Sequence, residues 1–380
     1  MHLVFLYAGI RSIHAESRGF TYKLGVKFKP HEMTLTNCCL NKAGDRYVNA
    51  SYDRSVRLYS TSTLLSTPSQ STSPPPPLLT LNQHESLVYH LTYNLPFSDK
   101  LLTCSLDRTA RLWDGATGKS LYALVGHQGE VVAGCFDAKS TKIATGGMDG
   151  AALVWDVRTG LQVARLDAHE DGVPVVEFEP SFAERETTRD KNGSIITAGM
   201  DGHVRVWDLR NPAEEVWDWG LDDEASVTGA SWVGESRTVV AGGTDGTVRL
   251  WDAVSGAEIG MSRDCSGDVL SVVASIDGAY IAAAGSDGVA RIYDGKTLRL
   301  LHTLQGTNNE ICRVTFSPSG EMLLTSGNEG TIRLWDVAGG HCLQTLDDHS
   351  GSVFAAHFSY DSTKVITAAR DDTVIVYEAV

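Results

Sequence analysis

Histidine, threonine, aspartate and tryptophan recur together along the chain, and these four residue types can form a hydrogen-bonded relay. The histidine can donate to the aspartate, while the threonine hydroxyl and the tryptophan N–H extend the relay at its other end. On paper, the histidine, aspartate and threonine resemble the base, acid and nucleophile of a catalytic triad. Three sets are complete: His84, Thr103, Asp107 and Trp113; His127, Thr145, Asp149 and Trp155; His169, Thr197, Asp201 and Trp207.

The recurrence of these sets favours a structural role over catalysis. The sets repeat along the chain and are predicted to lie buried between strands, as a structural polar network does. In a fifth copy, Asp223 and Ala241 replace the histidine and the threonine, and in a sixth copy Cys265 and Ala283 do so. A shared network predicts this joint loss, because a half-satisfied buried polar group costs more than none.

A second motif, Gly118-Lys119-Ser120, suggests a phosphate-binding loop. The full motif needs a glycine at position 113, which is Trp113, and a helix afterwards, whereas a strand is expected here. The equivalent Thr159-Gly160 and Ser255-Gly256 indicate a simple turn between strands. There is no metal-ligand spacing and no nucleophile–base pair. We therefore expect no enzyme activity, no catalytic residue and no cofactor.

The elements that must position these side chains form a repeat, seen most clearly from Gly126 to Asp156. The segment starts with Gly-His, continues with apolar runs at Val131–Phe136 and Lys142–Gly147, and ends in Trp155-Asp156. A Gly-His start, a Trp-Asp end and a period of about 40–45 residues resemble the WD repeat, in which four strands form one blade of a β-propeller.

The register of the repeat can be checked by position. An acidic residue is followed six positions later by an aromatic at Asp53/Tyr59, Asp107/Trp113, Asp149/Trp155, Asp201/Trp207, Asp245/Trp251, Asp287/Tyr293, Glu329/Trp335 and Asp371/Tyr377. Successive aromatics lie 54, 42, 52, 44, 42, 42 and 42 residues apart. A blade cannot bury both faces alone, so the copies must close into a ring. The sequence predicts an all-β, eight-bladed WD-repeat propeller.

The two ends of the chain are predicted to share one blade. The last strand, Val374 to Tyr377, leaves three residues after it, so the eighth blade lacks an outer strand. Tyr22 to Phe28 alternates and stands where other repeats carry that strand, and we expect it to close the ring. Residues 1–20 are predicted to be a poorly ordered N-terminal extension before one domain, residues 21–380.

Two insertions lengthen the repeat, one at residues 60–77 and one at residues 182–193. The first is rich in serine and threonine and ends in Pro74 to Pro77, which predicts a disordered or polyproline-like loop. The second is highly charged. Both are expected on the face of the ring opposite the Gly-His and Asp turns.

Composition excludes several partners. The net charge of −15 is spread along the chain and repels nucleic acid on average. No apolar run reaches the 18 or so residues that span a membrane. The seven cysteines include no C-x-x-C pair, and most lie in apolar runs, as small buried residues of a reducing compartment do. We expect protein partners, no nucleic acid, no membrane and a monomeric propeller.

The residue just before each turn acid is predicted to face the mouth of the central channel. In chain order these residues are Tyr52, Leu106, Met148, Met200, Thr244, Ser286, Asn328 and Arg370. The first four are apolar and contiguous around half the ring, and large apolar side chains on an exposed rim favour a protein contact. The alternative is that loop tips carry scattered apolar residues in any protein. The candidate protein-binding residues are these four and Arg370.

Several stretches resemble one family of WD-repeat proteins, the outer-dynein-arm assembly factors. They are Leu35-Thr36-Asn37 with Leu40-Asn41-Lys42; Ser51-Tyr52-Asp53-Arg54; Val88-Tyr89 with Asn94 and Asp99-Lys100; Ala144-Thr145-Gly146 with Met148-Asp149; and Phe358 with Tyr360, Val365-Ile366-Thr367 and Asp371. The resemblance covers residues from 21 to the end, although the family has a longer region before its propeller.

This resemblance implies a cargo adaptor that links preassembled outer dynein arms to the intraflagellar transport complex. It implies outer-arm dynein subunits and that transport complex as partners, and the cytoplasm and the cilium or flagellum with its base as the location. Another scaffold role on the same fold, such as a ubiquitin-ligase substrate receptor or a signalling subunit, stays open.

Overall fold

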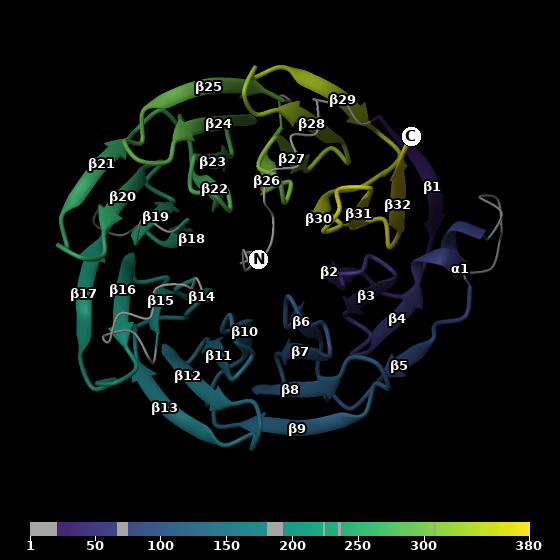
Figure 1. Cartoon of the computed structure of the whole chain (residues 1–380), viewed down its shortest axis with the longest axis horizontal. Coiled ribbons are helices and arrows are strands. Elements are labelled where there is room, and N and C mark those ends of the chain that lie inside the picture. The colour runs from purple at the N-terminus through teal and green to yellow at the C-terminus, as the bar shows by residue number, and fades with distance from the viewer. Residues whose placement is uncertain (1–20, 67–74, 181–192, 223–224, 235–236, 307–308) are drawn as a thin grey trace.

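The computed structural model describes residues 21–66, 75–180, 193–222, 225–234, 237–306 and 309–380. These residues form eight four-stranded antiparallel sheets, which surround a central channel like the blades of a propeller (Figure 1). The prediction of an all-β, eight-bladed propeller is confirmed. The predicted extension at 1–20 and the charged insertion, apart from Gly193, lie outside the described residues.

Blades 1 to 4 follow one another along the chain, and each runs from its inner strand to its outer strand. Blade 1 contains β2 (Leu35–Leu40), β3 (Arg46–Ser51), β4 (Val56–Ser60) and β5 (Leu79–Leu81). Blade 2 contains β6 (Val88–Tyr93), β7 (Lys100–Ser105), β8 (Thr109–Asp114) and β9 (Ser120–Val125). Blade 3 contains β10 (Val131–Phe136), β11 (Lys142–Gly147), β12 (Ala151–Asp156) and β13 (Gln162–Asp167). Blade 4 contains β14 (Val175–Phe178), β15 (Ser194–Ala198), β16 (His203–Asp208) and β17 (Glu215–Gly220).

Blades 5 to 8 complete the ring in the same order. Blade 5 contains β18 (Val227–Val233), β19 (Thr238–Gly243), β20 (Val248–Asp252) and β21 (Glu258–Ser262). Blade 6 contains β22 (Val269–Ala274), β23 (Tyr280–Gly285), β24 (Val289–Asp294) and β25 (Leu300–Gln305). Blade 7 contains β26 (Ile311–Phe316), β27 (Met322–Gly327), β28 (Ile332–Asp336) and β29 (Cys342–Leu346). Blade 8 contains β30 (Val353–Phe358), β31 (Lys364–Ala369), β32 (Val374–Ala379) and, as its outer strand, β1 (Tyr22–Phe28).

Strand β1 closes the ring as the sequence predicts. It pairs antiparallel with β32 from Tyr22 opposite Ala379 to Phe28 opposite Val374. Tyr22 and Val26 bury their side chains in clusters that also contain residues of blades 7 and 1, respectively. The pairing covers the exposed edge of β32 and joins the two ends of the chain in one sheet.

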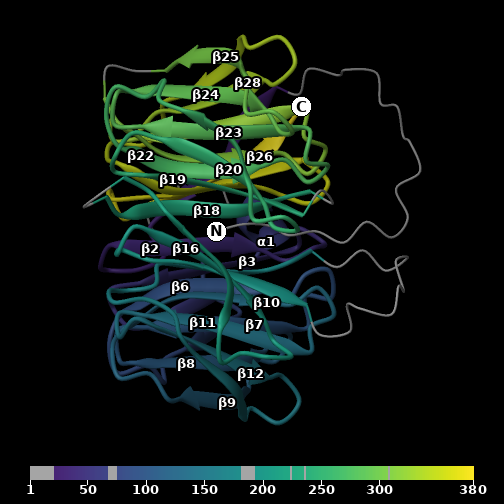
Figure 2. The same cartoon turned by 90° about the vertical axis from the view of Figure 1, so that its left-hand side faces the viewer.

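Burial follows the position of each strand within its blade. The second strands are buried on both faces, as in β7, where every residue from Leu101 to Ser105 is buried. They lie between two neighbouring blades, so their sequences are apolar without alternation. The outer strands alternate, as in β13, where one face packs and the other faces solvent. The edge-on view shows inner strands such as β2, β6 and β18 crossing the thickness of the ring, which places the connections on two faces (Figure 2).

The turn between the second and third strands is built around its acid. In blade 2, Asp107 Oδ1 accepts the Thr109 N–H at 2.9 Å, which is how aspartate stabilises a tight turn. The residue after the acid adopts a positive φ, which glycine reaches at no cost. At Gly150 (φ 73°) a Cβ atom would also lie 2.2 Å from the His169 carbonyl oxygen. The following residues have this conformation: Arg54, Arg108, Gly150, Gly202, Gly246, Gly288, Gly330 and Asp372.

The start of the loop predicted at residues 60–77 is ordered, which differs from the expectation of disorder there. Thr61–Ser66 form a short helix, α1, in which Leu64 is buried against the closing strand with Val26 and Phe28. The average composition of the segment is polar and therefore did not predict this contact. Leucines at the start of a polar segment can still bury their side chains when another element, here β1, packs beside them. Residues 67–74 lie outside the described part. No helix in the described part is long and apolar enough to cross a membrane.

Candidate protein-binding rim and central channel

The inner strands enclose a central channel with a volume of about 1220 Å³. Its wall is formed by the first strand of each blade, from β2 to β30 (Figure 1). Seven of these strands have a register shift near their start, for example between Leu35 and Asn37 in β2. Such bulges bend a strand and re-aim its side chains. The channel is concave and large, as sites for ligands or peptide segments are.

The eight residues before the turn acids, which we call the rim, occupy equivalent positions at the channel mouth. Each donates its backbone N–H to a carbonyl beside the entry of the inner strand, at 2.8–3.1 Å. Tyr52 bonds to Thr34, Met148 to Glu130, and Arg370 to Ser352. These bonds tie the turn of each blade to its inner strand, so the rim backbone is held firmly.

The five candidate binding residues form one arc of this rim. Arg370 belongs to blade 8, and Tyr52, Leu106, Met148 and Met200 belong to blades 1 to 4, so the arc is continuous around the ring. All five line the channel. Tyr52, Met148 and Met200 are 47%, 39% and 43% exposed, while Leu106 is half-buried. These are large apolar side chains left in water at a concave site.

The structure brings the four members of each complete polar set together. In blade 2, His84 Nδ1 lies 2.7 Å from Asp107 Oδ2, His84 Nε2 lies 2.7 Å from Thr103 Oγ1, and Trp113 Nε1 donates to Thr103 Oγ1 at 2.9 Å. In blade 3 the distances are 3.0 Å for His127–Asp149, 2.8 Å for His127–Thr145 and 3.0 Å for Trp155–Thr145. In blade 4 they are 2.8 Å for His169–Asp201, 2.9 Å for His169–Thr197 and 3.0 Å for Trp207–Thr197.

The protons of this relay have one consistent arrangement. The indole N–H of Trp155 donates to the Thr145 oxygen, so the threonine hydroxyl is free to donate to Nε2 of His127. The Nδ1–H of His127 then donates to Asp149. Burial lowers the pKa of His127 despite the neighbouring carboxylate, so the ring is neutral at pH 7. Thr145 is fully buried. Its hydroxyl is therefore shielded from solvent, as the predicted structural role of the set requires.

The relay also positions the rim. Asp149 Oδ2 accepts the backbone N–H of Gln128, in the loop from the preceding blade, at 2.7 Å. The corresponding bonds join Asp107 to Glu85 at 3.0 Å and Asp201 to Glu170 at 3.2 Å. Burial raises the pKa of Asp107, but hydrogen bonds from His84 and Thr109 outweigh it and lower the pKa below its usual value. An ionised aspartate therefore anchors the loop next to Leu106, Met148 and Met200.

Blades 1 and 8 contain a shorter relay, and tyrosine occupies the tryptophan position. In blade 1, His31 lies 2.7 Å from Asp53 and 2.6 Å from Asn49. In blade 8, His349 lies 2.7 Å from Thr367 and 3.3 Å from Asp371. The histidine keeps both of its partners in these blades, but the tyrosine does not take over the indole bond: the Tyr59 hydroxyl donates to the Pro30 carbonyl oxygen at 3.5 Å.

Blades 5 and 6 have alanine at the threonine position of the relay, Ala241 and Ala283. Asp223, predicted at the histidine position of blade 5, lies outside the described residues. In blade 6, Arg291 donates to Asp287 at 2.7 Å and to Cys265 Sγ at 3.4 Å. Arg291 lies four residues after the turn acid, and the same spacing pairs an arginine with the acid in blades 1, 4, 5 and 7. This arginine was not among the residues predicted from the sequence, although its recurrent spacing could have identified it.

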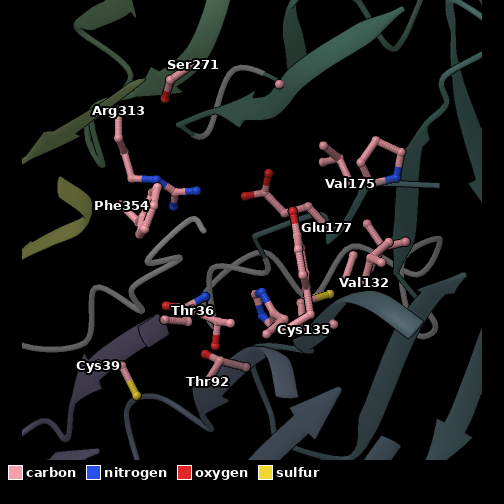
Figure 3. A pocket seen from close by; sticks show the side chains of 18 of the residues that line it. Thr36, Cys39, Thr92, Val132, Cys135, Val175, Glu177, Ser271, Arg313 and Phe354 are labelled. Atoms are coloured by element: carbon pink, nitrogen blue, oxygen red, sulfur yellow. The ribbon is translucent and has the colours of Figure 1, made fainter. Parts of the chain in front are cut away.

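The structure also reveals ionisable side chains inside the channel. Glu177 and Arg313 point into it from different parts of its wall (Figure 3). His90 and His357 line it as well. The sequences of the inner strands are otherwise mainly apolar. A single ionisable residue within such an apolar run is the signal that could have identified these four side chains.

Comparison with known proteins agrees with this architecture. A family model described as "WD domain, G-beta repeat" matches residues 75–114, 118–156, 160–208, 221–252, 261–294, 298–336 and 340–378. Five of the seven matches join the outer strand of one blade to the three following strands of the next, as 118–156 joins β9 to β10–β12; the match at 221–252 starts after β17, and the match at 261–294 includes only the end of β21. Strands β2, β3 and β4 precede these matches, and the structure confirms that they form the additional blade that the Asp53/Tyr59 spacing predicts.

Two relatives and one solved structure are similar to the chain. "Dynein assembly factor with WD repeat domains 1" of Homo sapiens is 32% identical over 86 residues, 23% of this chain and 18% of that protein. The same protein of Macaca fascicularis is 34% identical over 80 residues, 21% of this chain and 17% of that protein. The alignments thus span less than a fifth of these relatives. The crystal structure of the computationally designed Ika8 protein is 23% identical, with a TM-score of 0.78 over 93% of this chain and 99% of that one; this likeness concerns the fold alone.

Proposed function

The chain belongs to the family built from WD-domain, G-beta repeats, and we infer from this that it is a propeller scaffold for protein interaction. We propose that its cargo is the axonemal outer dynein arm, which it links as an adaptor to intraflagellar transport in cilia or flagella. The similarity to a dynein assembly factor supports this role. So do the first-repeat and last-repeat stretches that resemble the outer-dynein-arm assembly family.

The apolar arc of the rim is the observation that carries the proposal of a binding face. The fold does not require apolar residues there, because Thr244, Ser286 and Asn328 occupy the same position in blades 5 to 7. An exposed apolar side chain that the fold does not need is free to serve a partner. Tyrosine supplies a rigid anchor, and methionine supplies an adaptable surface.

The arc is also preorganised. The backbone bond of each rim residue and the adjacent relay fix the loops before any partner binds. Ordering an interface costs about 0.5–1.5 kcal/mol for each flexible side chain, and a rigid loop lowers the remaining cost. Arg370 at one end and Glu130 beside Met148 supply polar groups at the border of the apolar surface.

A pair of substitutions tests this binding face. Tyr52→Ala with Met148→Asp should weaken the binding of purified outer-arm dynein to the full chain more than tenfold, measured by titration with the immobilised protein. Central anchors are worth about 2 kcal/mol or more each, and 1.4 kcal/mol is a factor of ten. The free energy of unfolding should stay within about 0.5 kcal/mol of the unaltered value, because both positions are exposed.

The matched control changes the same kinds of side chain elsewhere. Phe97, in the β6–β7 connection, and Met261, on the outer strand β21, are exposed, and both lie away from the channel mouth. Phe97→Ala with Met261→Asp should leave dynein binding unchanged. An equal loss of dynein binding in both pairs, or no loss in the first pair, contradicts the rim as the binding face.

Affinity capture with the unaltered chain tests the dynein role itself. If it recovers cullin-adaptor proteins in place of dynein heavy and intermediate chains, that role is contradicted.

A further inference from the structure

Four ionisable residues stand at two levels of the channel wall. Arg313 and His90 are at the upper level, by which we mean the level nearer the rim. Each pairs with the fifth residue of the neighbouring strand, Ser326 and Cys104, which lies two positions before the rim residue. His357 and Glu177 are at the lower level, and each pairs with the third residue of its neighbouring strand. Arg313, His357 and His90 belong to blades 7, 8 and 2, whereas Glu177 belongs to blade 4. The basic residues therefore share one side of the channel, and the acid faces them from the other.

These side chains have polar atoms that the described residues leave without partners. Both ring nitrogens of His357, which is 2% exposed, and Nε2 of His90 have no hydrogen-bond partner there. Among the described residues no carboxylate forms an ion pair with Arg313. Buried polar groups are almost always hydrogen-bonded in folded proteins. A cluster of unpartnered groups on one wall of a channel marks a place for a ligand.

The electrostatics around Arg313 favour a ligand with one negative charge. Burial, and then the charge of Arg313, lower the pKa of His357 to about 3, and burial lowers that of His90 to about 3 as well. Burial raises the pKa of Glu177 to about 8, so this acid is mostly protonated at pH 7 and does not repel an anion. Arg313 then supplies one positive charge, flanked by two neutral imidazoles that can donate hydrogen bonds.

A carboxylate matches this set of donors better than a phosphate. The planar guanidinium of arginine pairs with a carboxylate through two parallel hydrogen bonds. The other cation among the described lining residues, Arg370, belongs to the rim at the channel mouth. A phosphate dianion beside Arg313 would bring a second charge that Arg313 alone does not compensate, and a buried uncompensated charge is costly. We propose that the channel holds a carboxylate-binding site formed by Arg313, His90 and His357, which takes a small carboxylic acid or the acidic side chain of a peptide segment.

The site is inside the channel and does not depend on which protein binds the rim. Its test uses the full chain and two peptides, acetyl-Ala-Glu-Ala-amide and acetyl-Ala-Gln-Ala-amide, which differ by one negative charge. Calorimetric titration should show saturable binding of the glutamate peptide, with a Kd at least tenfold lower than that of the glutamine peptide. Acetate in a separate titration shows whether a free carboxylate suffices: competition by acetate supports a small acid, and binding of the peptide alone supports a peptide segment. Equal Kd values for the two peptides, or tighter binding of inorganic phosphate than of the glutamate peptide, would overturn the proposal.

Variants connect the binding to the named residues. Arg313→Gln should raise the Kd of the glutamate peptide at least tenfold and change that of the glutamine peptide less than twofold. Glu177→Gln, on the opposite wall, is the matched control and should leave both within twofold. An unchanged Kd in Arg313→Gln refutes the site. A measurement on the unaltered protein covers the case in which that variant does not fold: the glutamate peptide should protect Arg313 from phenylglyoxal, as mapped by mass spectrometry, and absence of protection counts against the site.

Discussion

Replacing Trp155 with phenylalanine isolates the contribution of the buried relay to stability. The substitution removes the N–H that donates to Thr145 Oγ1 at 3.0 Å. Thr145 is fully buried, so water cannot replace the lost donor. Leaving a buried acceptor without its partner costs about 1–3 kcal/mol, beyond the packing lost with the smaller ring.

Trp251 provides the matched comparison in a blade without the relay. It is 3% exposed, against 2% for Trp155, so the packing lost on replacement by phenylalanine is similar. Ala241 stands at the threonine position of its blade, so Trp251→Phe leaves no hydroxyl unsatisfied. Trp251 also stacks on Trp219 with ring centroids 5.2 Å apart, a contact that phenylalanine retains in part. We expect Trp155→Phe to cost about 1–3 kcal/mol more than Trp251→Phe.

Equilibrium denaturation followed by far-ultraviolet circular dichroism measures this difference without relying on tryptophan fluorescence. A double-mutant cycle sharpens it: in a Thr145→Val background the acceptor is gone, so Trp155→Phe should cost no more than Trp251→Phe. Interacting neighbours show coupling energies of about 0.5–3 kcal/mol in such cycles. Equal losses for the two tryptophans, or no coupling between Thr145 and Trp155, would refute the relay as a source of stability.

Two further predictions concern ring closure and pH. Deletion of residues 1–30 removes β1 and should raise amide hydrogen exchange in blade 4 as well as in blade 8, because loss of closure removes the constraint that holds the blades in one ring; a deletion variant that melts like the intact protein contradicts this. Burial lowers the pKa of His127, His169 and His349, so below pH 6.5 the unfolded chain binds protons that the folded chain does not. The free energy of unfolding should therefore fall between pH 6.5 and pH 5, before the carboxylates titrate. Glu177 acts in the opposite direction: because its pKa is raised to about 8, its contribution to the free energy of unfolding declines as pH rises above 4.5. Glu177→Gln should therefore steepen the fall in stability between pH 6.5 and pH 5. A denaturation midpoint that stays constant down to pH 5 contradicts the expectation.

Sequence predicted the blades because their signals are local. An acid in the turn and an aromatic six residues later both act within one hairpin, through the Asx turn and the relay below it, as Asp149 and Trp155 do. The sequence also predicted the position of the rim, because the rim residues directly precede the turn acids. Whether Tyr52 and Met148 bind a partner stays a prediction, since an exposed apolar side chain does not name what covers it.

The short helix α1 was not predictable from local composition. Its polar segment contains Leu64, which is buried only because β1, from the other end of the domain, lies beside it. Arg291 in blade 6 is different: it lies four residues after Asp287, as Arg205 does after Asp201, so its pairing with the turn acid is local and this spacing could have predicted it.

The sequence by itself determined the number of blades, their strands and the closure of the ring by Tyr22–Phe28, because hairpin turns and strand alternation depend on neighbouring residues. Only the tertiary structure decided which polar groups meet inside the channel. Arg313 and His90 are 223 positions apart in the chain, and their blades are separated on one side of the ring by two others. Such groups share one wall because eight blades close around a common axis. The surroundings of an inner-strand residue therefore depend on blades distant in sequence, and no local pattern specifies them.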